Sequence, residues 1–513
     1  MIDTIIEHAR IFDGRSTTAC STDVAIVDDR IALIGSLGDR DAYERVSGTG
    51  LTLAPGFIDV HAHTDELWLA DGRCEGKIRQ GVTTEIGGNC GRSVAPALGA
   101  PDEQWHDLAS FFALVERGGV ALNVATLVGL GTTRRRIRQD VPGRLDPSEL
   151  LAETALVRET IDQGAIGVSS GLIYTPSRFA DVHELAACAA AARAAGMPRY
   201  VTHLRDEADG LIEAVEEALA VGRRADVSVQ FSHHKAAWKR NWGKVHQTLA
   251  RIDRARAAGL HVGADAYPYV AMWTDLETLL PDDARDGGKT AILARLEDEA
   301  AAETLAIRLE LAHMGRWHDV LISSVGSERN AELAGRRLDE IASRWRLAPA
   351  RAVLRLLRDE RLEVEAIFFA LSEADVATVL SADFVSIGSD ASARALDGPT
   401  AQGVVHPRTL GCFPRVFGRF VRGRGTLEIG EAIRRMTSLA ADQFGLRDRG
   451  HVTVGAYADL VLFDAGAIVD TATYDRPYAY PRGIESVWVN GRPVVRNGAT
   501  TGARPGRVLR GGR

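Results

Sequence analysis

The run GFIDVHAH (residues 56–63) follows a proline, is apolar over most of its length, and carries two histidines near its end. Seven further runs rich in β-branched and apolar residues follow it: GVTTEIGG (81–88), LNVATLVG (122–129), GAIGVSSG (164–171), RYVTHL (199–204), VSVQFSHHK (227–235), HVGADAYPY (261–269) and FVSIGSD (384–390). Stretches of helical period lie between several of them, at 149–163, 181–195, 209–224 and 244–258. Eight buried strands alternating with helices predict a parallel (β/α)8 TIM barrel.

The two ends of the chain differ from this pattern and resemble each other. Short alternating runs separated by Gly and Asp occur in IIEHARIFDG and DVAIVDDRIALIGS near the start, and in HVTVGAYADLVLFDA and ESVWVNGRPVVRNG near the end. Such runs favour antiparallel strands, and chain ends commonly lie close together. We therefore predict a small β-sandwich domain from residues 1–54 and 447–513, beside a barrel of residues 55–446.

The connection between the seventh and eighth runs, residues 270–383, is much longer than a single helical crossover. It contains DARDGGKTAILARLEDEAAAETLAIRLE, whose composition is typical of helices. We predict a helical insertion at 276–345 that lies near the barrel mouth.

Composition excludes several classes of protein. Hydrophobic residues make up 45% and charged residues 25% of the 513, which is typical of a globular chain and not of a disordered one or a coiled coil. The 61 basic and 69 acidic residues give a net charge of −8, so we expect neither nucleic acid nor a membrane surface as partner. Five scattered cysteines, no signal-peptide pattern and no long apolar segment predict a protein of the reducing cytoplasm. Only five lysines occur, at 77, 235, 239, 244 and 289.

Polar residues gather at the ends of the predicted strands, where barrel active sites are built. Residues two apart on a strand face the same side, so His61 and His63 can point at one metal ion. A thiol, further imidazoles and a carboxylate follow other strands, and together they form a ligand set suited to zinc. These additional residues are Cys90, His203, His233 or His234, and Asp390.

Each residue also has a structural interpretation. A single histidine at a strand end is usually a hydrogen-bonded polar residue, and a single cysteine is usually a small core side chain. Asp390 could cap a helix, because SDAS is a good N-cap sequence. The combined pattern over eight ordered strands favours a metal site.

Several motifs together resemble the D-aminoacylase branch of the amidohydrolase superfamily, over about residues 1–497. The motifs are PGFIDVHAHTD, GVTTEIGGNCG, GVSSGLIYTPS, VTHLRDE, SHHK, GADAYPY, IGSDAS and HPRTLGCFPRVF. The resemblance implies a zinc-dependent amidohydrolase that hydrolyses N-acyl-D-amino acids to a carboxylate and a D-amino acid. The substrate would thus be a small molecule, and a metal-activated water would be the nucleophile.

The resemblance also implies roles for individual residues. Cys90, His203 and His233 would hold zinc tightly, and His61, His63 and Asp390 would line a weaker neighbouring site. Asp390 would also act as the general base and acid. His233 is preferred to His234 because it shares a strand face with Lys235. Three residues would bind the substrate carboxylate: Lys235, Tyr267 and Arg408.

Other functions stay open at this point. A cyclic-amide hydrolase of the hydantoinase or dihydroorotase kind usually carries a bridging lysine, and none occurs in 164–171. An amidase acting on a peptide-like natural product fits the same ligand set. A barrel without activity would be expected to have lost ligands, whereas all are present. Leu130 stands where many relatives carry histidine, and the sequence determines neither the preferred side chain nor the oligomeric state.

Overall fold

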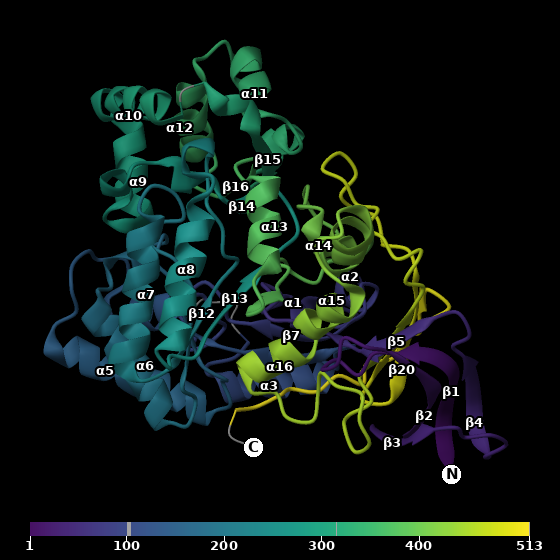
Figure 1. Ribbon diagram of the computed structural model, residues 1–513. Helices are drawn as coiled ribbons and strands as arrows, with labels where there is room; N and C mark the ends of the chain where they lie inside the picture. Colours follow the sequence, from purple (N-terminus) through teal and green to yellow (C-terminus); the bar gives the residue numbers. More distant parts are fainter. Residues whose placement is uncertain (100–103, 314, 512–513) are drawn as a thin grey trace.

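The computed structural model describes residues 1–99, 104–313 and 315–511, and a parallel barrel lies at its centre (Figure 1). Its strands pair in chain order, in two sheets of parallel pairs. The barrel closes between its first and last strands, where Ala62 pairs with Ala391 and the Asp390 amide donates to the His61 carbonyl (2.8 Å). The strands are β6 (Phe57–Asp59), β7 (Val82–Gly87), β8 (Asn123–Thr126) continued by β9 (Val128–Gly129), β10 (Val168–Gly171), β11 (Arg199–His203), β12 (Ser228–Phe231), β13 (Val262–Ala266) and β17 (Val385–Ile387). The predicted barrel is thereby confirmed.

Helices cover the outside of the barrel (Figure 1). The four predicted helical segments are α5 (Pro147–Asp162), α6 (Val182–Ala194), α7 (Leu211–Ala225) and α8 (Lys244–Ala257). Helix α5 begins where the Asp146 carboxylate accepts the amides of Ser148 and Glu149 and where proline occupies the first turn. The other helices over the barrel and its edges are α1 (Leu67–Ala70), α2 (Glu75–Ile78), α3 (Leu108–Gly118), α4 (Leu130–Arg138), α13 (Glu373–Ser381), α14 (Arg408–Arg415), α15 (Ile429–Met436) and α16 (Ser438–Phe444).

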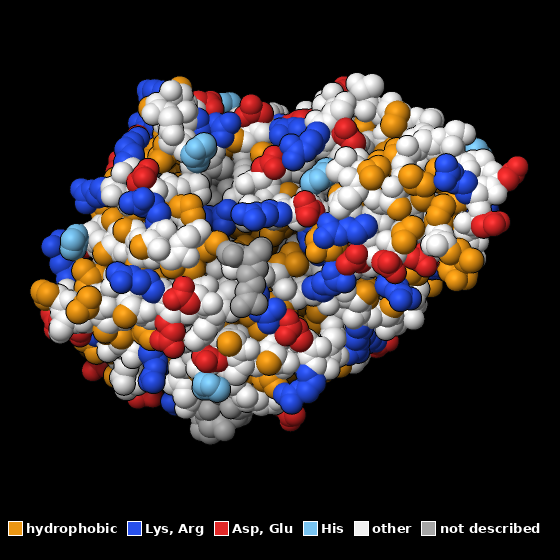
Figure 2. All heavy atoms as spheres, turned by 90° about the horizontal axis from the view of Figure 1, so that it is seen from below, with side chains coloured by type: hydrophobic (Ala, Val, Ile, Leu, Met, Phe, Trp, Pro, Cys, Tyr) orange, Lys and Arg blue, Asp and Glu red, His pale blue; other side chains and the backbone are white. Residues whose placement is uncertain are grey.

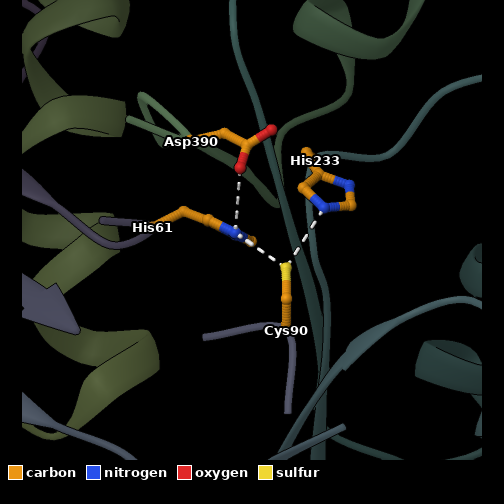
Figure 3. Close-up of side chains that lie close together, drawn as sticks. All are labelled: His61, Cys90, His233 and Asp390. Atoms are coloured by element: carbon orange, nitrogen blue, oxygen red, sulfur yellow. Dashed lines mark hydrogen bonds and ion pairs between the residues drawn. The ribbon is translucent and has the colours of Figure 1, made fainter. Parts of the chain in front are cut away.

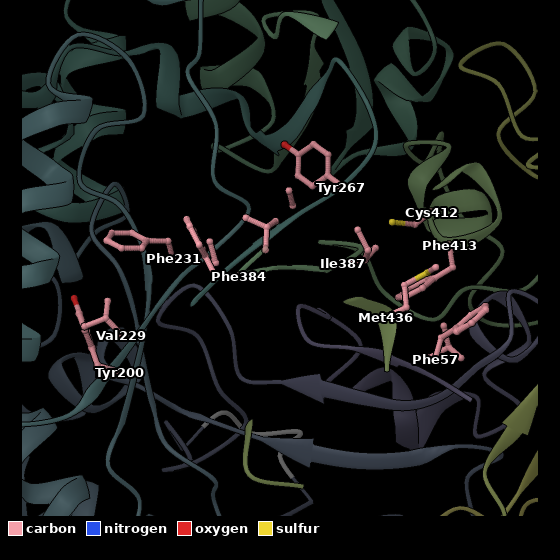
Figure 4. Packing of buried hydrophobic residues seen from close by; sticks show 14 of the residues in the cluster. Phe57, Tyr200, Val229, Phe231, Tyr267, Phe384, Ile387, Cys412, Phe413 and Met436 are labelled. Carbon is pink, nitrogen blue, oxygen red and sulfur yellow. The ribbon is translucent and has the colours of Figure 1, made fainter. Parts of the chain in front are cut away.

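The core lies between the barrel strands and these helices (Figure 4). Phe57 of β6 stacks on Phe413 of α14, with ring centroids 5.8 Å apart. Tyr200, Val229 and Phe231 of β11 and β12 belong to the same buried cluster. A core that continues from the barrel to its covering helices holds the strand ends in fixed positions.

Strands from both ends of the chain form one nine-stranded sheet, as the sequence predicts for the small domain. β5 joins the two halves, because it pairs with β1 on one side and β18 on the other. The domain boundaries themselves remain predictions. The strands are β1 (Ile2–Ile11), β2 (Cys20–Val27), β3 (Arg30–Gly35), β4 (Ala42–Ser47), β5 (Thr52–Pro55), β18 (Leu460–Phe463), β19 (Ile484–Val489), β20 (Arg492–Arg496) and β21 (Ala499–Thr500).

The last described residues leave this sheet and run along the barrel. The Leu509 amide donates to the Val124 carbonyl (2.7 Å), and the Gly511 amide donates to the Gly164 carbonyl (3.0 Å). Figure 2 views the molecule from below, and basic and acidic side chains are interspersed over much of the face it shows. Within the described ranges, no helix has the length and apolar character needed to cross a membrane.

The insertion between β13 and β17 rises above the barrel (Figure 1) and has a hydrophobic core of its own. Besides helices it contains an antiparallel sheet of order β14-β16-β15, which the helical composition of 276–345 does not reveal. The central strand β16 lies outside that range, so the sheet depends on pairing between distant segments. The strands are β14 (Met272–Asp275), β15 (Val320–Val325) and β16 (Val364–Phe368), and the helices are α9 (Gly288–Glu297), α10 (Glu299–His313), α11 (Leu338–Trp345) and α12 (Pro349–Asp359).

Candidate active site

A cavity of about 1170 Å³ lies between the carboxyl ends of the barrel strands and the insertion. The insertion contributes β14 and the segment after it to the cavity wall. Every predicted site residue except His61 lines this cavity, and His61 is fully buried. The lining members are His63, Cys90, His203, His233, Lys235, Tyr267, Asp390 and Arg408.

The Cys90 thiol lies between two imidazoles (Figure 3). Its Sγ is 3.3 Å from His61 Nε2 and 3.5 Å from His233 Nε2. Burial opposes ionisation of the thiol, but the positive charge that His61 and His233 can carry lowers the pKa of Cys90 well below its usual value. A thiolate with two imidazole nitrogens is a strong donor set for zinc.

Asp390 completes this group from the eighth strand. Its Oδ1 lies 3.5 Å from His61 Nε2 and 3.1 Å from His63 Nε2, and its Oδ2 forms an ion pair with Arg408 Nη2 at 2.8 Å. Burial raises the pKa of Asp390, but the Arg408 charge outweighs it and the pKa falls well below the usual range. One donor atom from each of His61, Cys90, His233 and Asp390 lies within 4.8 Å of the others.

Three of these residues have left-handed backbone conformations. φ is +52° at Cys90, +36° at His233 and +52° at Asp390. This region is unfavourable for residues with a Cβ atom, and surrounding contacts must hold it in place. Its occurrence three times at one cavity indicates that packing fixes the directions of these side chains.

His203 approaches the same centre from β11. Its ring centroid is 4.5 Å from that of His233, and neither of its ring nitrogens hydrogen-bonds a described residue although both atoms are buried. With Glu207 and His233 it forms a second group of donors that lie within 4.8 Å of one another. A buried imidazole whose nitrogens make no hydrogen bond is available to bind an ion.

Two carboxylates that the sequence analysis did not single out fix the histidines. Glu207 Oε1 lies 3.0 Å from His233 Nδ1, and Asp265 Oδ1 lies 3.2 Å from His61 Nδ1. Such contacts orient a metal-binding imidazole. His233 Nδ1 also lies 2.6 Å from Lys235 Nζ. Asp265 could have been found, because it shares a strand face with Tyr267. Glu207 lies in a loop after β11, and only the tertiary structure brings it to the site.

The structure separates His233 from its neighbour His234. His234 Nε2 lies 2.8 Å from Thr248 Oγ1 of α8, and its ring packs near Phe231. Burial and the Lys235 charge lower the pKa of His234 to about 4. His234 therefore belongs to the barrel's outer packing, whereas His233 faces Cys90.

The three predicted substrate-binding residues lie close together. Arg408 Cζ is 4.5 Å from the ring centroid of Tyr267, and the Lys235 ammonium is 5.7 Å from it. Lys235 Nζ donates to Glu207 Oε1 at 2.6 Å. Tyr267 Oη and two nitrogens of Arg408, Nε and Nη1, are buried without a hydrogen-bond partner among the described residues. Buried donors in this state are suited to an anionic group of a ligand.

Comparison with known proteins agrees with this geometry. Residues 46–495 match the model of the amidohydrolase family. An N-acyl-D-glutamate deacylase of Alcaligenes xylosoxydans xylosoxydans is 36% identical over 520 residues, which cover 99% of this chain and 96% of that protein. A D-aminoacylase of the same organism is 35% identical over 525 residues, which cover 99% and 97%.

A solved structure is similar over the same extent. The N-acyl-D-glutamate deacylase of Bordetella bronchiseptica, complexed with zinc and a phosphonate inhibitor that mimics the tetrahedral intermediate, has a TM-score of 0.85 at 34% identity, and the match covers 99% of each chain. The chain therefore belongs to the amidohydrolase family. Within that family its similarity is to the D-aminoacylase branch, which confirms the resemblance found in the sequence motifs.

Proposed function

We propose that this protein is a zinc-dependent hydrolase that converts N-acyl-D-amino acids to a carboxylate and a D-amino acid. The observation that carries the proposal is the Cys90 thiol between His61 and His233, with the Asp390 carboxylate beside it at the mouth of a barrel. The names of two full-length relatives, an N-acyl-D-glutamate deacylase and a D-aminoacylase, support the substrate class.

The side chains of the site fit a zinc ion. Cys90, His203 and His233 would hold it tightly, with His61, His63 and Asp390 forming a neighbouring site. His203 supports this assignment, because its buried ring nitrogens have no hydrogen-bond partner among the described residues and Nε2 lies 3.8 Å from Glu207 Oε2. When bound, zinc acts as a Lewis acid that lowers the pKa of water and polarises a carbonyl group.

Asp390 is suited to move a proton at Oδ1. Burial raises the pKa of Asp390 and the Arg408 guanidinium lowers it by more, so the carboxylate is ionised. A base this weak would accept a proton only from a water that a bound metal ion makes acidic. A carboxylic acid with so low a pKa readily gives that proton to the leaving nitrogen. His63 at 3.1 Å keeps Oδ1 directed toward the centre of the site.

Substrate binding uses the free donors near Tyr267. Arg408 forms an ion pair with Asp390 through Nη2, which leaves Nη1 and Nε for the α-carboxylate. The Tyr267 hydroxyl, which is buried and has no partner among the described residues, would donate to the same group. The Lys235 ammonium at Glu207 adds positive charge. A carboxylate fixed at three points distinguishes D from L substrates by the direction of the scissile amide.

The test is amide hydrolysis by the zinc-loaded protein on paired N-acetyl-D- and N-acetyl-L-amino acids, measured as release of the free amine. We expect turnover of the D series and little of the L series. Equal rates on both series would contradict the proposal. If neither series reacts while zinc is bound, the metal-site assignment is kept and the substrate is another amide. Cyclic amides and acylated natural products would then be tested.

We also propose that the enzyme acts in the cytoplasm. Its five cysteines are all unpaired, and the reactive Cys90 among them needs a reducing environment. Fractionation of cells that express the natural gene checks this: the protein should accompany cytoplasmic markers.

A further inference from the structure

Lys77 lies beneath the active site and has no role in the function proposed above. It belongs to the short helix α2, and its side chain is fully buried. Its Nζ donates to Asp59 Oδ2 at 2.5 Å, to Ser389 Oγ at 2.8 Å and to the Ala391 carbonyl at 2.8 Å. An ammonium has three N–H donors, and here each has its own acceptor.

Asp59 extends these contacts to the first barrel strand. Its Oδ1 accepts the amide of His61 at 3.2 Å and the amide of Ser389 at 2.9 Å. The Lys77–Asp59 pair therefore contacts both neighbours of Asp390 in the chain and the backbone of His61. Burial excludes water from this pair, so its contacts are not exchanged with solvent.

Asp390 needs such support because of its backbone conformation. Its φ of +52° is unfavourable for a residue with a side chain, and only neighbouring contacts hold it there. Its amide donates to the His61 carbonyl, and its Oδ1 lies 3.5 Å from His61 Nε2. A shift of residues 389–391 would move the carboxylate away from His61, His63 and Arg408 together.

The Glu85 carboxylate extends this network of hydrogen bonds to the segment after the first barrel strand. Glu85 Oε2 lies 3.5 Å from Lys77 Nζ and accepts the Thr64 hydroxyl at 3.0 Å. Thr64 Oγ1 in turn accepts the amide of Ala393 at 2.8 Å. Lys77 thus lies where the segment after the first strand meets the segment after the eighth.

We propose that Lys77 is a positioning residue of the metal site: with Asp59 it fixes residues 389–391 and thereby sets the Asp390 carboxylate against His61 and His63. The proposal rests on the assignment of these side chains as metal ligands in the proposed function. It concerns the arrangement of the ligands, so it can be measured by metal binding without any substrate.

The test compares the wild type with the double variant Asp59→Asn, Lys77→Met. The double variant removes both charges of the ion pair, and the introduced asparagine keeps an oxygen for the two amides. Glu85 loses its cation in this variant but keeps the Thr64 hydroxyl and the Trp68 indole as donors. We expect the zinc affinity of the weaker site, formed by His61, His63 and Asp390, to fall by about tenfold in chelator competition. We also expect the absorption bands of the cobalt-substituted protein to change, and kcat to fall by about tenfold with KM nearly unchanged.

The matched control is Arg449→Met, Asp459→Asn. This ion pair is similarly buried but lies at the junction of the barrel and the terminal sheet. Removal of a purely structural ion pair should lower the melting temperature and leave the cobalt spectrum, the zinc affinity and kcat unchanged. Lys77 is assigned a positioning role only if its variant departs from this control in those three measurements.

If the double variant does not fold, a milder variant tests the positioning role of Lys77. Ser389→Ala removes one hydroxyl that Lys77 contacts, and we expect altered cobalt bands and a several-fold lower kcat. Wild-type bands, zinc affinity and kcat in whichever folded variant is obtained would overturn the proposal. Failure of the deacylase assignment is recognised separately, because wild type would then bind zinc and not hydrolyse N-acyl-D-amino acids.

Discussion

At the scale of single residues, the Asp390 carboxylate contacts more of the proposed site residues than the Cys90 thiol does. It contacts His61 and His63 through Oδ1 and Arg408 through Oδ2, and its backbone is held in a left-handed conformation. Cys90 differs from it, because the hydrogen bonds of its thiol to described residues go to the His61 and His233 imidazoles. In the proposed function the two residues have different roles: Cys90 would bind the metal, and Asp390 would move a proton.

Asp390→Asn separates these roles. The amide keeps the shape of the side chain but cannot accept a proton, so kcat should fall by roughly 10²–10⁴-fold. Zinc content, measured by atomic absorption after gel filtration, should stay close to that of the wild type because Cys90, His203 and His233 remain. Substantial hydrolysis by this variant would remove Asp390 from its proposed role.

Cys90→Ala should give the opposite pattern. Loss of the thiolate removes the softest ligand of the tight site, so the purified variant should contain little zinc and show little activity. Extraction of wild type with a strong chelator should reproduce the same loss, and added zinc should restore activity only in wild type. Full zinc content in Cys90→Ala would show that the tight site is elsewhere.

At the scale of elements, the helices around the barrel contain a buried carboxyl group away from the active site. Glu153 of α5 is 1% exposed and accepts the Thr133 hydroxyl of α4 at 2.9 Å. Burial, together with the nearby Glu184 carboxylate, raises the pKa of Glu153 to about 7 from its usual value of 4.5. The folded protein therefore prefers the neutral form of this group.

This predicts a pH dependence of stability. A raised pKa in the folded state gives stability that is complete below about pH 4.5 and is lost as the pH rises toward 7. Glu153→Gln imitates the neutral form, so its melting temperature relative to wild type should rise between about pH 5 and pH 8. Differential scanning calorimetry at both pH values checks this, with Glu159→Gln on the same helix as control. A constant difference between variant and wild type would contradict the raised pKa.

At the scale of the whole molecule, three parts meet around one barrel: the terminal sheet, the insertion and the segment after β21. The insertion has its own hydrophobic core and is joined to the barrel by polar contacts such as Arg92 Nη2 to Asp275 Oδ2 at 2.8 Å. The final segment runs along the barrel, where Val508 is buried and pairs with Val124. That segment contacts the end of the barrel opposite the active site.

Truncation after Gly502 tests what these contacts contribute to stability. Loss of the Val508 contact and of backbone hydrogen bonds to the barrel should lower stability by roughly 2–4 kcal/mol. The melting temperature should drop by several degrees, while zinc content and KM stay near the wild-type values because the cavity lies at the other end. An unchanged melting temperature would show that the segment contributes nothing to barrel stability.

The sequence by itself determined what depends on local pattern. Period-two and helical runs follow from which side chains a strand or helix buries, so the eight strands and four of the helices could be predicted from residues a few positions apart. The same alternation placed His61 beside His63. The structure brings these two together with Cys90, His203, His233 and Asp390, although their roles as ligands remain proposals.

Only the tertiary structure decided what depends on contacts between distant segments. Glu207 and Lys77 carry no local signal strong enough to mark them, and Lys77 contacts Ser389 across 312 positions of sequence. The sheet of the insertion and the path of the last described residues also depend on contacts between distant segments. Such contacts arise from the packing of whole elements, because a buried polar group finds its partner wherever the closed barrel brings one within reach.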